Sequence, residues 1–238
     1  MKNMNSWVPT KYVRSGSNWV ASRDPKQLLP ASRLAADSFV IRYAEAIETF
    51  AHGRLLDHGA GQSPLFGMYR DKVEEIIAVD WNNSLHNTSY VDIECDLNKK
   101  MPFGDESFDT IISSDVVAHL FNPINIMDDL ARILRPNGAI ILGTPFNYWM
   151  NEEPYDYFRW SKYAIVRLAE NSGLKVAKLW QCGGTSDVMS DVFLKGMQGK
   201  ISWAVPLVDS FLRLIKVARP NRVGRAAFTL GTVAVLTK

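Results

Sequence analysis

The chain has 238 residues, a formal net charge of +2 and a hydrophobic content of 47%. This length suits one α/β domain with a sizeable core. Charged residues make up 22% of the chain, which is typical of a globular protein rather than a disordered one. The small net charge selects no class of partner. Cys95 and Cys182 are too few for a disulfide framework, so we expect two reduced, buried thiols.

Neither a targeting segment nor a membrane span is predicted. Residues 1–10 are polar and lack the apolar core of a signal peptide. No stretch approaches the ~18 consecutive apolar residues that a membrane span needs. We therefore expect a cytoplasmic protein with a single domain over 1–238. Within it we expect an N-terminal arm or flap (1–32), a core (33–182), an insertion with an amphipathic segment (183–221) and a closing strand (226–237).

The first 30 residues contain Trp7, Tyr12, Trp19 and several basic groups, with little periodicity. They predict either an irregular arm packed on the domain or a flap that closes over a cleft. Residues 33–50 differ, because apolar side chains recur there at helical spacing. That spacing predicts one amphipathic helix ahead of the first strand of the sheet.

A strand and a glycine turn follow this helix. Residues 54–57 are apolar up to Asp57, and the next residues include Gly59 and Gly61. Glycine lets the backbone turn tightly and lets a ligand approach closely, because it has no Cβ. A strand that enters such a turn before a helix is a common cradle for a nucleotide-like cofactor. An ordinary glycine turn is the alternative.

A second apolar strand, residues 75–80, ends in Asp80. Asp80 lies about 20 residues beyond the glycines, where a doubly wound fold places a carboxylate for a ribose diol. Trp81 follows and either stacks beside a base or packs in the core. A carboxylate accepts from both ribose hydroxyls, so this acid supports the cofactor interpretation of the glycine turn.

The remaining elements alternate between strand and helix. Asn122 and Pro123 suit a helix cap and a first helical residue, and Gly173 suits a helix end. Such alternation predicts a mostly parallel sheet covered on both faces. We expect helices at 66–72, 122–134 and 161–171, and strands near 90–93 and at 108–114, 139–143, 175–181 and 226–236.

These landmarks together resemble the class I S-adenosylmethionine-dependent methyltransferases, over roughly residues 53–173. Asp57, Gly59 and Gly61 match the first family motif, Asp80 matches the second, and Asp96 matches an acid often placed near adenine. The runs Pro-Phe-Gly-Asp-Glu-Ser-Phe-Asp (102–109) and Leu-Arg-Pro-Asn-Gly (134–138) are typical of the methyltransferase type 11-like subgroup.

The resemblance implies a Rossmann-like, doubly wound sheet of seven strands in the order 3-2-1-4-5-7-6, with strand 7 antiparallel. It implies S-adenosylmethionine as cofactor. Ser63 departs from the family, which often has a third glycine there. The run from Gly59 to Pro64 also lacks the last glycine of a dinucleotide fingerprint, which argues against a nicotinamide-dependent oxidoreductase. The cofactor-binding residues that the resemblance implies are Asp57, Gly59, Gly61, Asp80, Trp81, Asp96, Leu97, Ser113 and Asp115.

His119 is the titratable group best placed for proton removal, because imidazole titrates near neutral pH. A packed or helix-capping histidine is the alternative. The run Pro-Tyr-Asp-Tyr-Phe-Arg (154–159) resembles a bacterial, surface-polysaccharide-associated subgroup of methyltransferases. Its aromatic and polar side chains suit a sugar, so we assign Asp156 to catalysis with His119, and Tyr155, Tyr157 and Arg159 to substrate binding. Residues 155–160 could instead only buttress the next helix.

Two positions depart from that subgroup, which often has His where Asn151 stands and Glu where Ala118 stands. These departures leave room for a non-catalytic S-adenosylmethionine-binding module. The favoured function is methyl transfer to a small-molecule acceptor, a hydroxyl of a sugar or a lipid-linked saccharide. No Asn-Pro-Pro-Tyr type of sequence follows the fourth strand, which argues against nucleic acid. Asp187 and Asp191 have helical spacing but no further ligand candidates nearby, so we expect no metal.

The tail is basic and apolar. From Lys195 to Lys238 it holds eight Lys or Arg residues and one acid, Asp209. In 201–218 the polar residues Ser202, Pro206, Asp209, Arg213 and Lys216 share one narrow stripe, and Pro206 predicts a helix start or break. Three alternatives follow: internal packing or a homodimer interface, a substrate lid, or peripheral contact with the inner membrane face that holds a lipid-linked acceptor.

Overall fold

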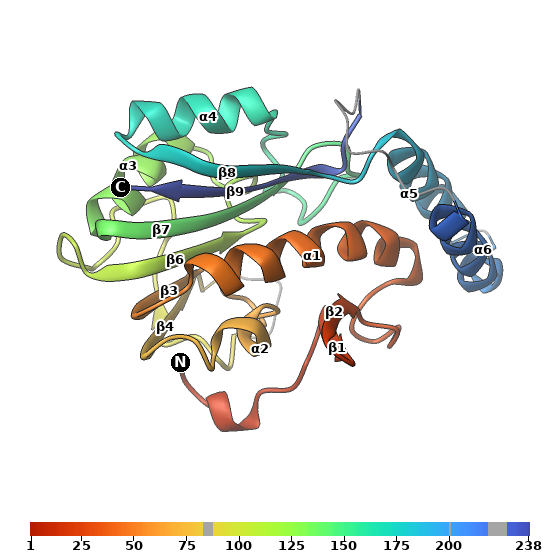
Figure 1. Ribbon diagram of the computed structural model, residues 1–238, viewed down its shortest axis with the longest axis horizontal. Helices are drawn as coiled ribbons and strands as arrows, with labels where there is room; N and C mark the ends of the chain where they lie inside the picture. Colours follow the sequence, from red (N-terminus) through yellow and green to blue (C-terminus); the bar gives the residue numbers. More distant parts are fainter. Residues whose placement is uncertain (83–87, 200, 219–227) are drawn as a thin grey trace.

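A computed structural model describes residues 1–82, 88–199, 201–218 and 228–238 of the chain. Its centre is a seven-stranded sheet with the order β5-β4-β3-β6-β7-β9-β8 (Figure 1). The strands are β3 (Arg54–His58), β4 (Glu75–Asp80), β5 (Ile93–Glu94), β6 (Phe108–Ser114), β7 (Leu134–Pro145), β8 (Lys175–Cys182) and β9 (Gly231–Thr237).

The strands β5, β4, β3, β6 and β7 pair in parallel, and β9 runs antiparallel to both of its neighbours. The expected order 3-2-1-4-5-7-6 counts the strands of this sheet alone. The strand numbers of the structure differ from the expected ones because β1 and β2 belong to a separate hairpin that the sequence did not predict. The mixed seven-stranded sheet and its antiparallel strand are as expected.

Helices cover both faces of the sheet. The helices α1 (Arg33–Phe50) and α2 (Phe66–Tyr69) lie on one face, and α3 (Pro123–Ile133) and α4 (Lys162–Asn171) lie on the other (Figure 1). Successive strand residues point to opposite faces. Leu55 therefore packs in the core under α1, while Leu56 packs in the core under α3 and α4.

Several boundaries differ from the expected ones. Asn122 stands at the start of α3, but its side chain makes no capping hydrogen bond. The helix α3 ends at Ile133 because β7 begins at once, so Pro136 lies within a strand rather than in a loop. The third strand occupies 93–94 instead of 90–93. The closing strand begins at Gly231, and the first two residues of its expected range, 226 and 227, lie outside the described residues.

The N-terminal arm is more regular than expected, because it contains a hairpin formed by β1 (Tyr12–Ser15) and β2 (Asn18–Ala21). Two short 3-10 turns, η1 (Met4–Ser6) and η2 (Pro30–Ser32), flank it. Strand β2 packs against α1. The arm is therefore folded onto the domain rather than irregular.

The insertion before β9 contains α5 (Thr185–Met197), which the sequence did not predict, then η3 (Ser202–Ala204) and α6 (Val205–Ala218). Pro206 is the second residue of α6, so it marks a helix start. Figure 1 shows α5 and α6 side by side at one end of the molecule. In the described part of the chain, no helix is both long and apolar enough to cross a membrane. Cys182 is buried, Cys95 is half-buried, and both are free thiols.

Candidate functional site

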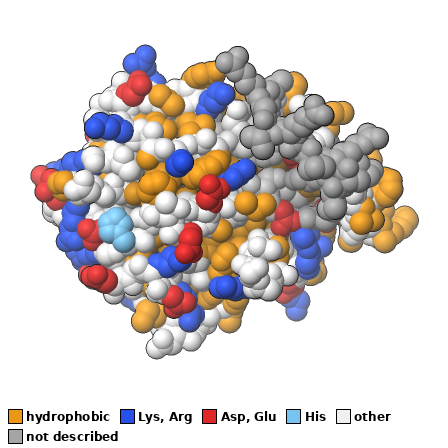
Figure 2. Space-filling view, viewed as in Figure 1, with side chains coloured by type: hydrophobic (Ala, Val, Ile, Leu, Met, Phe, Trp, Pro, Cys, Tyr) orange, Lys and Arg blue, Asp and Glu red, His pale blue; other side chains and the backbone are white. Residues whose placement is uncertain are grey.

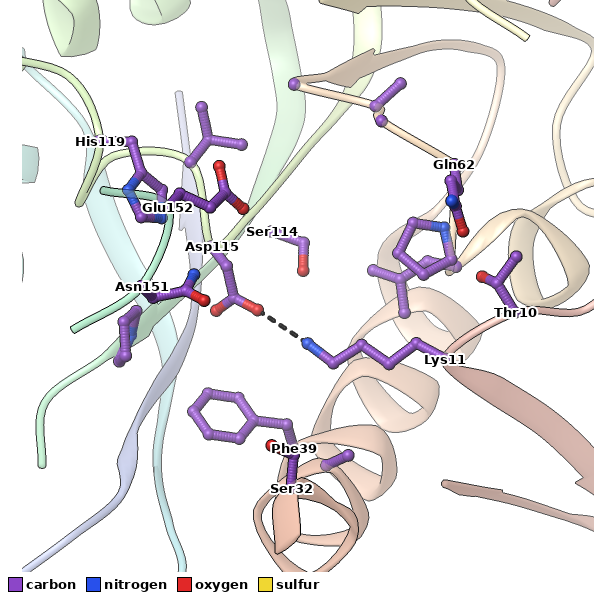
Figure 3. Close-up of a pocket in the computed structure, with 18 of the residues that line it drawn as sticks. Thr10, Lys11, Ser32, Phe39, Gln62, Ser114, Asp115, His119, Asn151 and Glu152 are labelled. Atoms are coloured by element: carbon purple, nitrogen blue, oxygen red, sulfur yellow. Dashed lines mark hydrogen bonds and ion pairs between the residues drawn. The ribbon is translucent and has the colours of Figure 1, made fainter. Parts of the chain in front are cut away.

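A cavity of about 540 Å³ opens at the carboxyl ends of β3, β4 and β6. Its walls come from the N-terminal arm, the glycine turn after β3, η2 with the start of α1, and the segment after β7 (Figure 3). Open α/β sheets bind ligands at this edge, and the volume is in the range of small-ligand sites. The cavity therefore lies where the sequence places a cofactor.

The glycine turn needs glycine for two reasons. Gly59 and Gly61 have φ values of 71° and 51°, in the left-handed region that glycine favours. A Cβ on Gly59 would also overlap the side chain of Val116. Ser63, at the third family glycine position, adopts φ 47°. The backbone there thus keeps the glycine-like conformation although the residue is serine.

Two buried carboxylates, Asp57 and Asp80, line the cavity. The Tyr69 hydroxyl donates to Asp57 at 2.6 Å, and burial nevertheless raises the pKa of Asp57 to about 6. Asp80 accepts from the backbone N–H groups of Gly61 and Trp81, each at 2.7 Å. Because each carboxylate oxygen has two lone pairs, Asp80 can still accept hydrogen bonds from a ligand.

Three further expected cofactor residues occupy different environments. Trp81 and Leu97 line the cavity. Asp96 is exposed and outside the lining residues, where it accepts from the Asn98 N–H at 3.0 Å and pairs with Lys99 at 3.3 Å. Its predicted role beside adenine therefore has no geometric support in this conformation.

At the end of β6 the side chain that reaches the cavity is Ser114, not Ser113. Ser113 is buried on the other face, with its Oγ 3.1 Å from His58 Nδ1. Ser114 Oγ bonds Tyr43 Oη at 2.8 Å. Because successive side chains along a strand point to opposite faces, the alternation along β6 could have shown that only one of the two serines faces the cavity.

Asp115 follows at the cavity wall, with φ 62°. Its Oδ2 lies 3.2 Å from Nζ of Lys11, which reaches in from the arm (Figure 3). Lys11 has no local motif that marks it as a site residue, so sequence reasoning missed it. The pair joins the arm to the end of β6, and Asn151 and Glu152 line the same cavity (Figure 3).

His119 also lines the cavity. Its Nδ1 lies 3.1 Å from the backbone oxygen of Tyr155. A carbonyl oxygen only accepts, so Nδ1 donates, and in the neutral ring Nε2 is then the nitrogen with the lone pair. Nε2 is buried and has no hydrogen-bond partner among the described residues. His58 contrasts with it, because burial lowers the pKa of His58 to about 4 and its ring lies outside the cavity lining.

The predicted catalytic Asp156 is engaged elsewhere. It forms an ion pair with Arg159 and accepts from the Asn151 N–H at 2.7 Å. The Arg159 guanidinium holds the pKa of Asp156 below its usual range. Arg159 also donates to the Trp149 oxygen at 2.9 Å. This pair braces the loop that carries Trp149 and Asn151 to the cavity, and neither of its members lines the cavity.

The two predicted sugar-binding tyrosines also stand outside the lining. Tyr155 packs edge-on against Trp81, with ring centroids 4.6 Å apart, and so lies behind both Trp81 and His119. Tyr157 is 45% exposed and packs against Phe121. The backbone oxygen of Ala118 accepts from the Tyr157 and Phe158 N–H groups. The roles of Asp156, Tyr155, Tyr157 and Arg159 in catalysis or substrate binding stay predictions.

Solved structures share this architecture. A [4+2]-cyclase named SpnF superposes with a TM-score of 0.58 at 15% identity, over 97% of this chain and 87% of that one. An S-adenosylmethionine-dependent methyltransferase from Mesorhizobium loti gives 0.56 at 10% identity, over 86% of this chain and all (100%) of that one. At these identities the likeness shows the fold alone, and a cyclase among the neighbours illustrates that this fold carries more than one reaction.

Sequence comparisons are more specific. Residues 56–142 match a family model described as a methyltransferase domain. A malonyl-[acyl-carrier protein] O-methyltransferase from Marinomonas sp. is 27% identical over 103 residues, 38% of this chain and 37% of that protein. A protein named "Probable S-adenosylmethionine-dependent methyltransferase" from Mycolicibacterium smegmatis is 25% identical over 142 residues, 51% of this chain and 55% of that protein.

The matched regions thus span about a third to a half of these curated relatives. Neither name refers to a polysaccharide, so the comparisons do not support the narrower, surface-polysaccharide resemblance. The matched residues 56–142 run from the glycine turn to β7 and include the cofactor motifs. Residues 56–142 are thus similar to a methyltransferase domain, and both relatives are methyltransferases by name.

Proposed function

We propose that this protein transfers a methyl group from S-adenosylmethionine to a hydroxyl of a small-molecule acceptor, a sugar or a lipid-linked saccharide. One observation carries the proposal: seven residues from separate motifs line one cavity at the carboxyl edge of the sheet. They are Asp57, Gly59, Gly61, Asp80, Trp81, Leu97 and Asp115.

The donor set fits this cofactor. The glycine turn brings backbone to the cavity wall beside the amino-acid half, and the missing Cβ of Gly59 lets that backbone pack against Val116. Asp57 offers a carboxylate toward an ammonium group. Asp80 accepts from ribose hydroxyls, while Trp81 and Leu97 provide apolar contact for the adenine ring.

The cofactor supplies a methyl group already activated by a positively charged sulfur. The protein then has to hold the acceptor oxygen in line with that methyl group. As the acceptor oxygen bonds the methyl carbon and the carbon–sulfur bond breaks, His119 Nε2 accepts the hydroxyl proton. The Nδ1 bond to the Tyr155 oxygen fixes the ring and its tautomer for this role.

The acceptor side of the cavity favours a polyol. Tyr148 and Trp149 supply aromatic faces, and Asn151 and Glu152 supply amide and carboxylate groups, all within the segment after β7. Rings that pack on C–H faces together with polar groups that bind hydroxyls suit a saccharide. Asn151 occupies the cavity where the related subgroup often has His, so we assign the base role to His119 alone.

Calorimetric titration with S-adenosylmethionine and its demethylated product tests the cofactor site. We expect micromolar binding that Asp80→Ala abolishes, because that change removes an acceptor and releases the Gly61 and Trp81 amides. The matched control, Asp96→Ala, removes an exposed carboxylate outside the cavity and should leave affinity unchanged. Absence of binding to either ligand would refute the cofactor assignment.

A panel of sugars and lipid-linked sugars, with radiolabelled methyl transfer as readout, tests the reaction. His119→Ala should lower turnover by roughly 10²- to 10⁴-fold without changing cofactor affinity. His52→Ala is the control, because His52 lies outside the cavity lining. Unchanged turnover in His119→Ala would show that the base assignment is wrong. Cofactor binding without transfer to any acceptor would favour the non-catalytic binding module.

A further inference from the structure

Helix α6 carries its large apolar side chains outward. Leu207, Phe211 and Leu214 are 67%, 61% and 70% exposed. They are spaced four and three residues apart, so they share one face of the helix. The opposite face is apolar too: Val205 is buried, Val208 and Leu212 pack beside it, and Asp209 is also buried. A helix on the surface of a monomeric protein normally has one apolar face, which points inward.

Helix α5 and the turn η3 extend this surface. Met189, Val192 and Phe193 of α5 are all exposed, and Trp203 of η3 is 77% exposed. Figure 2 shows hydrophobic side chains gathered at the end of the molecule where α5 and α6 lie in Figure 1. We define the α5–α6 apolar face as Met189, Val192, Phe193, Trp203, Leu207, Phe211 and Leu214.

The acids of these two helices face inward. Asp187 accepts from the Gly184 N–H at 2.7 Å, and Asp191 pairs with Lys195 at 2.6 Å. Both acids are buried, as is Asp209. The three acidic side chains of α5 and α6 therefore present no carboxylate at the α5–α6 apolar face.

The stretch of sequence that contains α6 has a positive net charge. Between residues 199 and 228 the sequence has six basic residues and one acid, the buried Asp209. An apolar helical face within a basic stretch of sequence matches a bilayer surface, where apolar side chains enter the acyl boundary and cations meet anionic headgroups. Tryptophan is favoured at that boundary. The basic residues are Lys200, Arg213, Lys216, Arg219, Arg222 and Arg225.

We propose that the α5–α6 apolar face docks on a membrane surface that contains anionic phospholipid. A second copy of this chain fits the same face less well. In a two-fold dimer the same patch meets itself, and the stretch of sequence that contains α6 has the same positive net charge in both copies. An anionic lipid surface neutralises those charges instead.

The docked face lies close to the cavity. Helices α5 and α6 both pack against η2. Ser32 of η2 lines the cavity, and Lys195 of α5 lies over the Tyr148 ring, another part of the cavity wall. Docking would therefore hold the cavity near the lipid surface, although the inference stands independently of the reaction proposed above.

Vesicle flotation tests the proposal with the full chain. Vesicles of phosphatidylcholine alone are compared with vesicles in which roughly a third of the lipid is phosphatidylglycerol. We expect wild-type protein to float with the anionic vesicles at least about tenfold better than with the neutral ones. The double variant Leu207→Ser with Phe211→Ser should lose about tenfold or more of this binding, because two exposed anchors are removed.

The matched control is Ile124→Ser with Tyr163→Ser, which removes two exposed apolar side chains from α3 and α4. It should float like wild type. Circular dichroism melting and cofactor titration of both double variants show whether the fold and the cofactor site persist. A failure of the proposed methyl transfer can therefore be told apart from a failure of membrane docking. No flotation of folded wild-type protein overturns the proposal. So does a dimer, by sedimentation equilibrium, that only the α6 variant dissociates while flotation is unchanged.

Discussion

Asp57 is buried at the wall of the cofactor cavity, so ionisation of its carboxyl group costs free energy in the folded state. Its pKa rises from 3.8 to about 6 because burial disfavours the carboxylate. Well below about pH 4 the side chain is protonated in both folded and unfolded states, so it costs nothing. As the pH rises to about 6 and beyond, the unfolded state ionises first, and the folded state loses about 3 kcal/mol of relative stability.

We therefore predict that Asp57→Asn is more stable than wild type near pH 7, and that this advantage vanishes near about pH 4. Tyr69 can still donate to the amide oxygen of the new side chain. Urea unfolding of the two proteins at both pH values measures the difference. Asp71→Asn, whose carboxylate is exposed, serves as the control. An advantage of Asp57→Asn that is equal at both pH values would contradict the prediction.

Individual positions were predictable where a motif fixes both residue type and backbone. Gly59 and Asp80 reached the cavity because each stands where a parallel strand ends, and parallel strands end at one edge. Ser113 and Asp96 also lie near strand ends, but neither lines the cavity. A shift by one residue along β6 turns a side chain to the other face, and Asp96 caps its own turn through the Asn98 N–H. Such local hydrogen bonds leave no trace in residue spacing.

Helix α5 contains a buried ion pair beside the cavity wall. Lys195 Nζ lies 2.6 Å from Asp191 and 3.3 Å from the centre of the Tyr148 ring, with both charged side chains nearly fully buried. Removing one partner leaves the other charge without compensation in the protein interior. Replacing both removes two desolvation penalties at once.

We predict that Lys195→Met and Asp191→Leu each lower the free energy of unfolding by about 3 kcal/mol or more. The double variant should recover most of that loss, since no unpaired charge remains. A double-mutant cycle by urea unfolding measures the coupling. Losses that simply add would show that the two side chains act independently. The control is Lys178→Met, which changes an exposed lysine on β8.

The N-terminal arm is held to the domain by Trp7. Its ring packs on Phe66 with centroids 5.1 Å apart, and its Nε1 donates to the Gln62 oxygen at 3.3 Å. A Cβ on Gly67 would lie 2.8 Å from the Trp19 ring and 3.1 Å from Trp7, so α2 keeps a glycine where the two indoles dock. The same arm delivers Lys11 to the cavity.

Trp7→Ala should therefore loosen the hairpin and weaken S-adenosylmethionine binding by roughly tenfold, because one wall of the cavity is less ordered. Hydrogen exchange over residues 12–21 and calorimetric titration give the two readouts. Val8→Ala, at the exposed neighbouring position, should change neither. Faster exchange without any loss of affinity would show that the arm is not a wall of the cofactor site.

Elements with strong periodicity were predictable from sequence. The ranges 33–50, 75–80 and 108–114 agree with α1, β4 and β6 to the residue. The hairpin of the arm was missed because its strands have four residues each and are stabilised by packing on α1 rather than by their own pattern. Helix α5 was missed because its exposed face is as apolar as its buried one. Packing on the rest of the domain positions both elements, and that packing is not visible in local periodicity.

The cavity joins four parts of the chain that are distant in sequence: the arm, the glycine turn, the start of α1 and the segment after β7. A ligand that contacts all four stabilises the folded state as a unit, because it binds that state and not the unfolded chain. Sequence analysis identified the glycine turn and the segment after β7. It offered a flap over a cleft as one of two alternatives for the arm but could not choose between them, because that contact depends on the fold.

We predict that S-adenosylmethionine or its demethylated product, at about 100 times its Kd, stabilises the fold by about 2.7 kcal/mol. For a chain of this length that corresponds to a rise in Tm of roughly 5–10 °C in one cooperative transition. Asp80→Ala should remove the shift. A nicotinamide dinucleotide should produce none, because the turn lacks the last glycine of the dinucleotide fingerprint. A rise in Tm with the nicotinamide dinucleotide alone would reverse the cofactor assignment, since the same cavity would then serve hydride rather than methyl transfer.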